Sequence, residues 1–229
     1  MGKYELLLFD ADGTLFDYDR AEAWSLERTV SALGIAWHGE ILPVYRQINR
    51  GYWQALERGE VTAAEIKVDR FRDLLTYLRS SADPVAAGET YLQHLGSSGF
   101  LINGTVELLD YLNGRVQLAL ITNGITRTQY GRLSASGIGK YFDPVIISGE
   151  VGYQKPDPRI FEVLFEQSGF SDKQKALIIG DSLTSDMQGG LNFGIDTCWY
   201  NPLGAPGNPT VPVTYEITSL EEIPEIAGL

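Results

Sequence analysis

The sequence predicts an α/β fold in which a doubly wound parallel sheet carries an inserted, all-helical cap subdomain. Three observations favour this class. Short apolar runs bounded by turn residues are typical of strands buried on both faces of a parallel sheet. From about residue 105 onward such runs alternate with helical patterns, which indicates a doubly wound arrangement. Residues 18–100 contain no convincing strand, which indicates a helical insertion.

The first predicted strand is the run YELLLF, which stops at Asp10. Five further apolar runs predict strands, and polar or turn residues follow most of them. The six runs cover residues 4–9, 116–121, 144–148, 176–180, 196–200 and 213–217. Since ligands of open α/β sheets bind outside the carboxyl ends of the strands, we expect the functional site among the polar residues that follow these runs.

Helical patterns lie between the later strands and throughout the insertion. The segment 158–169 begins with proline and ends at glycine, as many helices do. Thr62 has Glu65 three residues on, which is the pattern of a capping box at a helix start. The other predicted helices cover residues 104–114 and 184–194 in the core, and 19–34, 42–59, 62–80 and 83–96 in the insertion.

The insertion divides the chain into two predicted domains. Residues 1–17 and 101–229 form the α/β core, and residues 18–100 form the helical cap. The chain returns to the core through small residues and glycine at 97–104, a composition suited to a hinge. Asp17 lies at the turn into the cap, and we assign it no role beyond that of a solvated or hinge residue.

Composition excludes several classes of partner. A net charge of −12 disfavours binding to nucleic-acid polymers and to anionic membrane surfaces. No apolar run approaches the ~20 residues of a membrane span, and the N-terminus lacks the pattern of a signal peptide. A single cysteine, Cys198, excludes an intrachain disulfide and is expected to be a small buried residue. We therefore expect a cytoplasmic monomer or homodimer that acts on a small molecule.

Two carboxylates follow the first strand, in the stretch FDADGT. A carboxylate such as Asp10 can attack phosphorus as a nucleophile. A second acid two positions on, Asp12, can protonate the leaving oxygen and then activate water. Gly13 permits a tight turn whose amides could face a phosphate. Aspartate is also a common turn former, and that alternative explains one such residue better than two.

A second acidic pair follows the strand ALIIG. Asp181 comes directly after it and Asp186 five residues later. Carboxylates that converge from two strand ends suit Mg²⁺, which prefers one or two carboxylates together with water and substrate phosphate. A bound cation would also offset the repulsion among these acids. The alternative is an ordinary helix N-cap with a solvated neighbour.

Three further polar residues follow predicted strands or precede a helix. The Thr122 hydroxyl and the amides near Asn123 could hold a phosphoryl oxygen, although NG is also a common turn. Lys155 precedes the helix at 158–169. Aimed at the carboxylates, it could neutralise a nucleophile and the charge that develops on phosphorus. On base rates it would be a solvated surface lysine.

Four stretches in this order, FDADGTLFD, ITNG, QKPDP and GDSLTSD, resemble the motifs of the haloacid dehalogenase (HAD) superfamily over the whole chain. The resemblance implies a Rossmann-like core and a phospho-aspartyl intermediate. It implies that Asp10 is the nucleophile, Asp12 the general acid and base, and Thr122 and Lys155 the catalytic phosphate binders. The implied substrate-binding residues of the core are Asn123, through a phosphate-facing amide, and Gly124.

The same resemblance implies a Mg²⁺ site. Its ligands would be Asp10, Asp181 and the backbone carbonyl of Asp12, with Asp186 assisting. An acid at Asp12 favours a phosphatase over a dehalogenase, because a departing halide needs no proton. A phosphomutase would share Asp12. A phospho-accepting signalling domain without turnover is a further alternative, although it has little need for a second acid or a helical lid.

Within the superfamily, the chain resembles pyrimidine 5'-nucleotidases of the YjjG/YfnB type. The stretches that carry this resemblance include YRQINRGYWQALERGEVTAAEIKVDRF in the cap and YFDPVIISGEVGYQKPDPRIF in the core. It implies hydrolysis of nucleoside monophosphates, pyrimidine deoxynucleotides in particular. Another small phosphometabolite, phosphoglycolate or a sugar phosphate, is the alternative substrate. In the cap, Trp53 could stack on a base for about 1–3 kcal/mol and Asn49 could hydrogen-bond it, unless both are packing residues of the cap.

Overall fold

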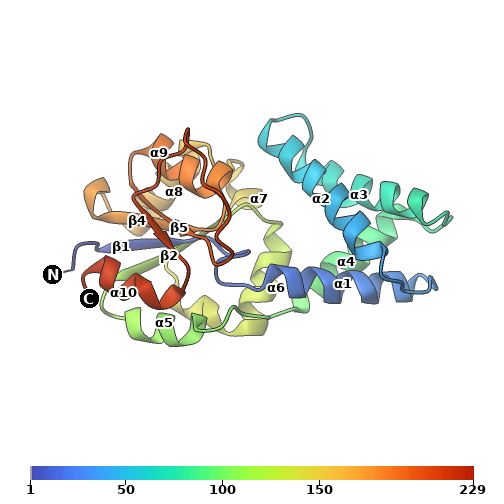
Figure 1. Cartoon of the computed structure of the whole chain (residues 1–229), viewed down its shortest axis with the longest axis horizontal. Coiled ribbons are helices and arrows are strands. Elements are labelled where there is room, and N and C mark those ends of the chain that lie inside the picture. Colours follow the sequence, from blue (N-terminus) through green and yellow to red (C-terminus); the bar gives the residue numbers. More distant parts are fainter. Residues whose placement is uncertain (1) are drawn as a thin grey trace. The chain divides into compact units, whose positions relative to one another are not determined.

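A computed structural model describes residues 2–229 and contains two compact units (Figure 1). The first comprises the residues up to Tyr18 together with Phe100–Thr126 and Ser136–Leu229. The second comprises Asp19–Gly99 and Arg127–Ala135, so it takes in a segment well beyond the helical insertion. We describe each unit by itself, and the domain boundaries drawn from the sequence stay a prediction.

The first unit is built on a six-stranded sheet in which all paired neighbours are parallel. The strand order is β3-β2-β1-β4-β5-β6, which confirms the predicted doubly wound α/β class. The strands are β1 (Leu6–Phe9), β2 (Gln117–Thr122), β3 (Val145–Ile147), β4 (Ala176–Gly180), β5 (Asp196–Tyr200) and β6 (Tyr215–Ile217).

Strand β1 lies at the centre, which explains why its residues are all apolar and buried. It pairs in register with β2 on one side and with β4 on the other. Phe9, its last residue, lies opposite Leu120 of β2 and Ile179 of β4. These three strands therefore end close together at one edge of the sheet, where the polar residues of the predicted site follow them.

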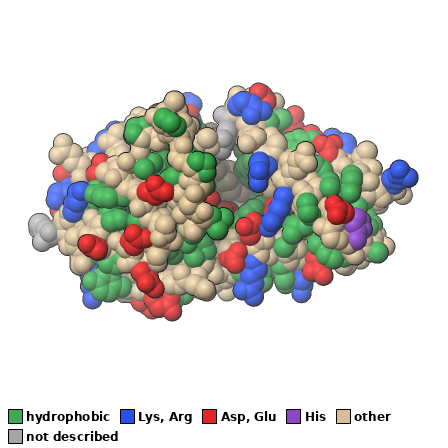
Figure 2. All heavy atoms as spheres, in the orientation of Figure 1, with side chains coloured by type: hydrophobic (Ala, Val, Ile, Leu, Met, Phe, Trp, Pro, Cys, Tyr) green, Lys and Arg blue, Asp and Glu red, His purple; other side chains and the backbone are tan. Residues whose placement is uncertain are grey.

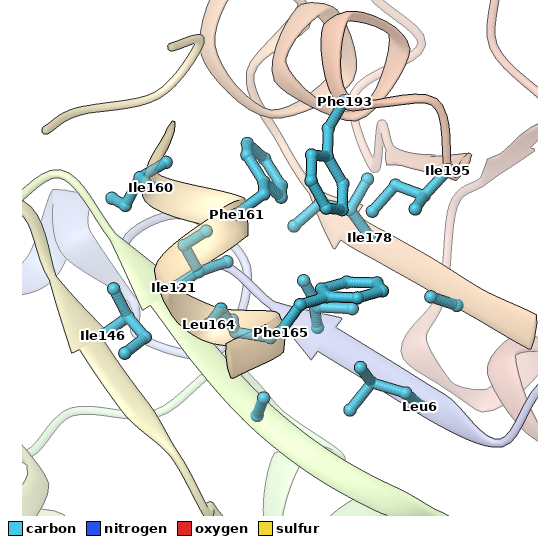
Figure 3. Close-up of a cluster of buried hydrophobic side chains, with 13 residues drawn as sticks. Leu6, Ile121, Ile146, Ile160, Phe161, Leu164, Phe165, Ile178, Phe193 and Ile195 are labelled. Carbon is cyan, nitrogen blue, oxygen red and sulfur yellow. The ribbon is translucent and has the colours of Figure 1, made fainter. Parts of the chain in front are cut away.

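One face of the sheet is covered by α8 (Pro158–Ser168) and α9 (Gln188–Phe193) (Figure 3). Asp157 caps α8 by accepting the Arg159 N–H at 2.9 Å. The apolar stripe of α8 packs on strand residues, and the rings of Phe165 and Phe193 meet edge to face at 4.8 Å. Full burial of such a side chain contributes about 1.5–3 kcal/mol, so this cluster is a main contribution to the stability of the first unit.

The remaining helical segments outside the insertion differ in part from the predicted ones, and one of them, α6, belongs mostly to the second unit. The predicted helix over 184–194 begins as a π-helical turn, Leu183–Met187, before α9 starts. Helix α6, which follows β2, was not predicted. The α-helices outside the insertion, besides α8 and α9, are α5 (Thr105–Leu112), α6 (Thr126–Ser136), α7 (Ser148–Val151) and α10 (Ile223–Ala227).

The second unit contains the four predicted helices of the insertion, which confirms the helical cap. They are α1 (Tyr18–Ala32), α2 (Ile41–Glu57), α3 (Ala63–Tyr77) and α4 (Pro84–Ser97). The capping box at the start of α3 is present, with Thr62 and Glu65 bonded to each other in both directions. The rings of Tyr45, Phe71 and Tyr91 lie 5.2–5.5 Å apart and form the aromatic centre of this unit.

Acidic and basic side chains are spread over the surface of each unit on the face shown in Figure 2. Hydrophobic side chains are scattered among them on this face. Among residues 2–229, no helix combines the length and the apolar character needed to cross a membrane.

Candidate active site

Asp10 is placed by the central strand. Its N–H donates to the Ile179 carbonyl oxygen at 2.9 Å, so the residue continues the ladder between β1 and β4. The apolar residues Leu6–Phe9 before it are buried in the core, and this fixes the position of Asp10 directly after them. Asp10 is buried, and its carboxylate lies at the carboxyl edge of the sheet, as predicted for a site residue.

Lys155 links the carboxylates at this edge. Its Nζ donates to Asp10 Oδ1 at 2.6 Å, to Asp186 Oδ1 at 2.6 Å and to the Ile121 carbonyl oxygen at 2.7 Å. An ammonium group has three donors, so each of them has an acceptor. Only 1% of the Lys155 side chain is exposed, which excludes the solvated surface lysine that base rates favoured.

The charges at this edge shift each other's pKa. Burial raises the pKa of Asp10 to about 7; the Lys155 ammonium opposes the rise and the Asp186 carboxylate adds to it. Burial alone would lower the pKa of Lys155, but the carboxylates of Asp10 and Asp186 raise it above its ordinary value. Lys155 is therefore a cation across the physiological range and a fixed counter-charge for the Asp10 and Asp186 carboxylates.

A cluster of three carboxylates could hold a metal ion. Asp10, Asp181 and Asp186 each offer an oxygen, and these oxygens all lie within 4.8 Å of one another. Asp181 is exposed as a whole residue, but protein atoms surround its carboxylate. This desolvation, together with the charges of Asp10 and Asp186, raises the pKa of Asp181 well above its ordinary value. When all three carboxylates are ionised, one lysine leaves two negative charges without a counter-charge. An all-oxygen donor set with surplus negative charge fits a hard divalent cation.

Asp186 also anchors the loop that follows β4. Its Oδ2 accepts the Ser182 N–H at 3.0 Å, and the residue is 1% exposed. A Cβ on Gly180 would lie 2.3 Å from Asp186 Oδ2, so only glycine fits at the end of this strand. The short π-helical turn places the carboxylate back toward the sheet, where it meets Lys155.

The loop after β1 is packed against Asp181. Gly13 has φ +85°, and a Cβ there would lie 2.5 Å from Asp181 Oδ2. Glycine adopts this backbone conformation without strain, and a side chain at this position would require the Asp181 carboxylate to shift. Asp12, one residue earlier, is half-buried, and its side chain is not a member of the three-carboxylate cluster. The Asp12 carboxylate is still close enough for its charge to raise the pKa of both Asp10 and Asp181, and its role in proton transfer stays a prediction.

Residues after β2 meet Lys155 as well. Thr122 is the last residue of β2 and is buried, while Asn123 and Gly124 are half-buried. The Asn123 side chain exchanges two hydrogen bonds of 2.8 Å with the main chain of Lys155. The predicted phosphate binders of the core therefore lie along one edge of the sheet with the carboxylates. Their catalytic roles remain predictions.

The two cap residues predicted to contact substrate have different surroundings. Asn49 is buried in the second unit, where its Nδ2 donates to Glu22 Oε1 at 3.1 Å and its Oδ1 accepts from Arg70 at 2.8 Å. Trp53 is half-buried on α2. The bonds of Asn49 show a structural role inside the cap. A substrate contact by either residue stays a prediction.

Trp199 belongs to the site but was not predicted. Its indole Nε1–H donates to the Asp181 carbonyl oxygen at 2.9 Å, and its ring is buried. In the sequence it is only one apolar residue of the strand DTCWY. Trp199 is distant from Asp181 in the sequence, and the two residues meet because β5 lies next to β4. The sequence therefore does not indicate this contact.

A family model of haloacid dehalogenase-like hydrolases matches residues 4–194, which is most of the chain and includes all the motif residues above. The chain belongs to the haloacid dehalogenase-like hydrolases. This confirms the resemblance noted in the sequence.

Three bacterial relatives of this HAD hydrolase match it along nearly their whole length. YfnB of Bacillus subtilis, a HAD-hydrolase by name, is 37% identical over 100% of this chain and 97% of its own. The pyrimidine 5'-nucleotidase PynA of Streptococcus pneumoniae is 39% identical over 96% of this chain and 93% of its own. The pyrimidine 5'-nucleotidase YjjG of Escherichia coli is 30% identical over 98% of both chains.

Solved structures support the same assignment. The crystal structure of YfnB bound to magnesium, which reveals an interdomain movement in that protein, matches with a TM-score of 0.94. It is 37% identical and covers 99% of this chain and 100% of its own. An L-2-haloacid dehalogenase from Xanthobacter autotrophicus has a TM-score of 0.79 at 18% identity over 97% of this chain and 98% of its own, and shows the shared fold alone.

Proposed function

We propose that this HAD hydrolase is a Mg²⁺-dependent phosphomonoester hydrolase that acts through a phospho-aspartyl intermediate on Asp10. The observation that carries the proposal is the position of Lys155 Nζ, which lies 2.6 Å from both Asp10 Oδ1 and Asp186 Oδ1. Asp181 joins these two carboxylates in one cluster, and a further acid, Asp12, lies two residues after Asp10 in the sequence. A nucleophile, a fixed counter-charge and a separate acid are the parts that phosphoryl transfer to a carboxylate needs.

The reaction has two steps. In the first, an Asp10 oxygen forms a bond to phosphorus while the bond to the leaving oxygen breaks, and Asp12 gives that oxygen its proton. In the second, Asp12 takes a proton from water, whose oxygen attacks phosphorus and releases inorganic phosphate from Asp10. Throughout, Lys155 offsets the charge on the nucleophile and the phosphoryl group, and Thr122 with the Asn123 and Gly124 amides holds phosphoryl oxygens.

The residues fit the cofactor. Asp10 and Asp181, with the Asp12 carbonyl and the assistance of Asp186, would hold Mg²⁺. When bound, the ion neutralises charge on the phosphoryl oxygens. The oxygen donor set and the surplus negative charge of the cluster support this choice, as does the magnesium bound to the similar protein YfnB.

For the substrate we propose 5'-nucleoside monophosphates, with pyrimidine deoxynucleotides preferred. Two full-length relatives, at 39% and 30% identity, are named pyrimidine 5'-nucleotidases. Within this proposal, Trp53 and Asn49 of the cap remain the candidate contacts to the leaving nucleoside. A second candidate is a sugar-type phosphate, which is favoured by the N-acylneuraminate-9-phosphatase of mouse, 26% identical over 99% of this chain.

The test is a phosphate-release screen with Mg²⁺ across nucleoside monophosphates, sugar phosphates and phosphoglycolate. We expect multiple turnovers on pyrimidine deoxynucleotides. The Asp10→Asn variant keeps the Lys155 acceptor but lacks the nucleophile, so its kcat is expected to fall by about 10⁴-fold or more. Strong activity on sugar phosphates with none on nucleotides would overturn the substrate. Labelling by a small phosphodonor without turnover would instead indicate a phospho-accepting signalling domain.

A further inference from the structure

Asn123 holds the main chain of Lys155 through both polar atoms of its side chain. Asn123 Nδ2 donates to the Lys155 carbonyl oxygen at 2.8 Å, and the Lys155 N–H donates to Asn123 Oδ1 at 2.8 Å. A side-chain amide carries one carbonyl acceptor and an NH₂ donor. It therefore satisfies the main chain of Lys155 much as a residue on a neighbouring strand would.

A turn-forming role does not account for this arrangement. An asparagine that only shapes a turn bonds its own backbone about two residues on. Here the two bonds span 32 residues and join the end of β2 to the loop between α7 and α8. The side chain therefore connects two separate segments of the active site.

The other end of Lys155 is fixed by the carboxylates. Its Nζ is held by Asp10, Asp186 and the Ile121 carbonyl, all within 2.7 Å. A free lysine side chain carries about 2 kcal/mol of rotamer entropy, which must be lost to hold one geometry. Because Asn123 also holds the Lys155 main chain, the position of the Lys155 Cα is fixed, and its side chain can reach both carboxylates at once.

We propose that Asn123 is a positioning residue for Lys155, an inference that rests on the hydrolase function proposed above. Its side chain holds the Lys155 loop against the end of β2, so that Nζ lies between Asp10 and Asp186. In the proposed reaction the main-chain amide of Asn123 faces the phosphoryl group. One residue therefore ties the phosphate-binding end of β2 to the lysine that offsets the phosphoryl charge.

The chain offers a matched control for the loss of this clamp. Asn201 holds the main chain of Ala205 in the same way, with bonds of 2.9 Å and 2.8 Å, and its Nδ2 also donates to Glu216. No lysine of the catalytic cluster depends on it. Asn123→Ala and Asn201→Ala thus remove equivalent amide clamps, one at the site and one in the loop after β5.

The first readout is kcat and KM for p-nitrophenyl phosphate at saturating Mg²⁺. A displacement of about 1 Å at a reacting group can cost ~10²-fold, so we expect Asn123→Ala to lower kcat by about 10–100-fold while KM changes by less than about threefold. Asn201→Ala should change kcat by less than about twofold, although it loses at least as much unfolding free energy.

The second readout is the ¹H–¹⁵N signal of the Lys155 ammonium in ¹⁵N-lysine-labelled protein, identified by its absence in Lys155→Met. Burial and three acceptors slow its proton exchange, so the signal is expected in wild type and in Asn201→Ala, and to shift or broaden in Asn123→Ala. The inference is overturned if either readout of Asn123→Ala matches that of Asn201→Ala. If wild type hydrolyses no phosphomonoester, the proposed function fails, and the ammonium signal alone decides the clamp.

Discussion

At the scale of single residues, Lys155 controls the electrostatics of the active site. Three carboxylates lie close together in a largely buried region, which by itself would favour their neutral forms. The ammonium of Lys155 contacts two of them and lowers the cost of their charge. The sequence alone predicts that these neighbouring acids repel each other. A lysine and a divalent cation can offset that repulsion.

Cys198 differs from the residues of the site, because burial keeps its thiol in the neutral, unreactive form. Burial raises the pKa of its thiol to about 12. Only the thiolate is strongly nucleophilic, so at pH 8 we predict negligible reaction with a thiol reagent in the folded protein and full reaction in denaturant. Because the folded-state pKa is raised, this residue costs no stability below pH 9, and stability falls as pH rises from about 9 toward 12.

Titration with a chromogenic thiol reagent at pH 8 checks this prediction. Cys198→Ala serves as the blank for non-specific reaction. Rapid stoichiometric modification of the native protein, with loss of hydrolysis, would show that the thiol is accessible and contradict the burial argument.

At the scale of elements, helix packing in the cap depends on one glycine. A Cβ on Gly88 of α4 would lie 2.3 Å from the Lys67 carbonyl oxygen of α3, an approach that real Cβ atoms do not show. Gly88→Ala would therefore push the two helices apart, and overpacking of this kind costs about 1–3 kcal/mol. We predict a lower urea midpoint for this variant.

Gly51 provides the matched control for that prediction. It lies on α2, is exposed, and nothing lies within 4 Å of the Cβ position. Alanine there should stabilise the helix by up to about 1 kcal/mol, since glycine is the weaker helix former. Urea unfolding that showed the same effect for both substitutions would contradict the close approach of α3 and α4.

Neighbouring strands shape the metal site through the main chain. Trp199 on β5 donates to the Asp181 carbonyl at the end of β4. Trp199→Phe keeps an aromatic ring but removes this bond, so the Asp181 loop loses an anchor. We predict Mg²⁺ affinity weaker by about tenfold, since partners that orient a metal ligand commonly contribute 10–100-fold.

Titration calorimetry with Mg²⁺ measures this effect directly, and Trp53→Phe on the cap controls for the loss of an indole. Unchanged affinity in Trp199→Phe, or an equal loss in Trp53→Phe, would show that the bond to the Asp181 carbonyl does not support the metal site.

At the scale of the whole molecule, the sequence predicts those parts of the fold and of the candidate site that depend on residues close together in the chain. Apolar runs ending in Asp10 and Asp181 located the sheet edge, because parallel strands align their carboxyl ends. The boundary of the helix after Asp181 was less accessible, since a π-helical turn has no distinct residue pattern. Helix α6 was missed because apolar residues are few along it: most of its buried side chains, Thr128, Gln129 and Arg132 among them, are polar.

Contacts that depend on tertiary neighbours could not be predicted. Asn123 precedes a glycine, and NG indicates only a turn, yet its side chain holds Lys155. The residue type of Asn49 also suits base recognition, and the structure gives its amide partners on other helices of the cap. In both cases the residue type limited the possible bonds, and the fold determined the partner.

In the mechanism that we propose, Asp10 becomes phosphorylated and Asp12 activates the water that releases the phosphate. The most direct measurement is pre-steady-state hydrolysis of p-nitrophenyl phosphate by Asp12→Asn, with mass spectrometry of the quenched protein. The leaving p-nitrophenolate needs no proton, so the first step should persist while the second slows by about 10²–10⁴-fold. We predict a burst of one p-nitrophenolate per enzyme and phosphate on Asp10. A steady rate without a burst, or phosphate on a different residue, would contradict it.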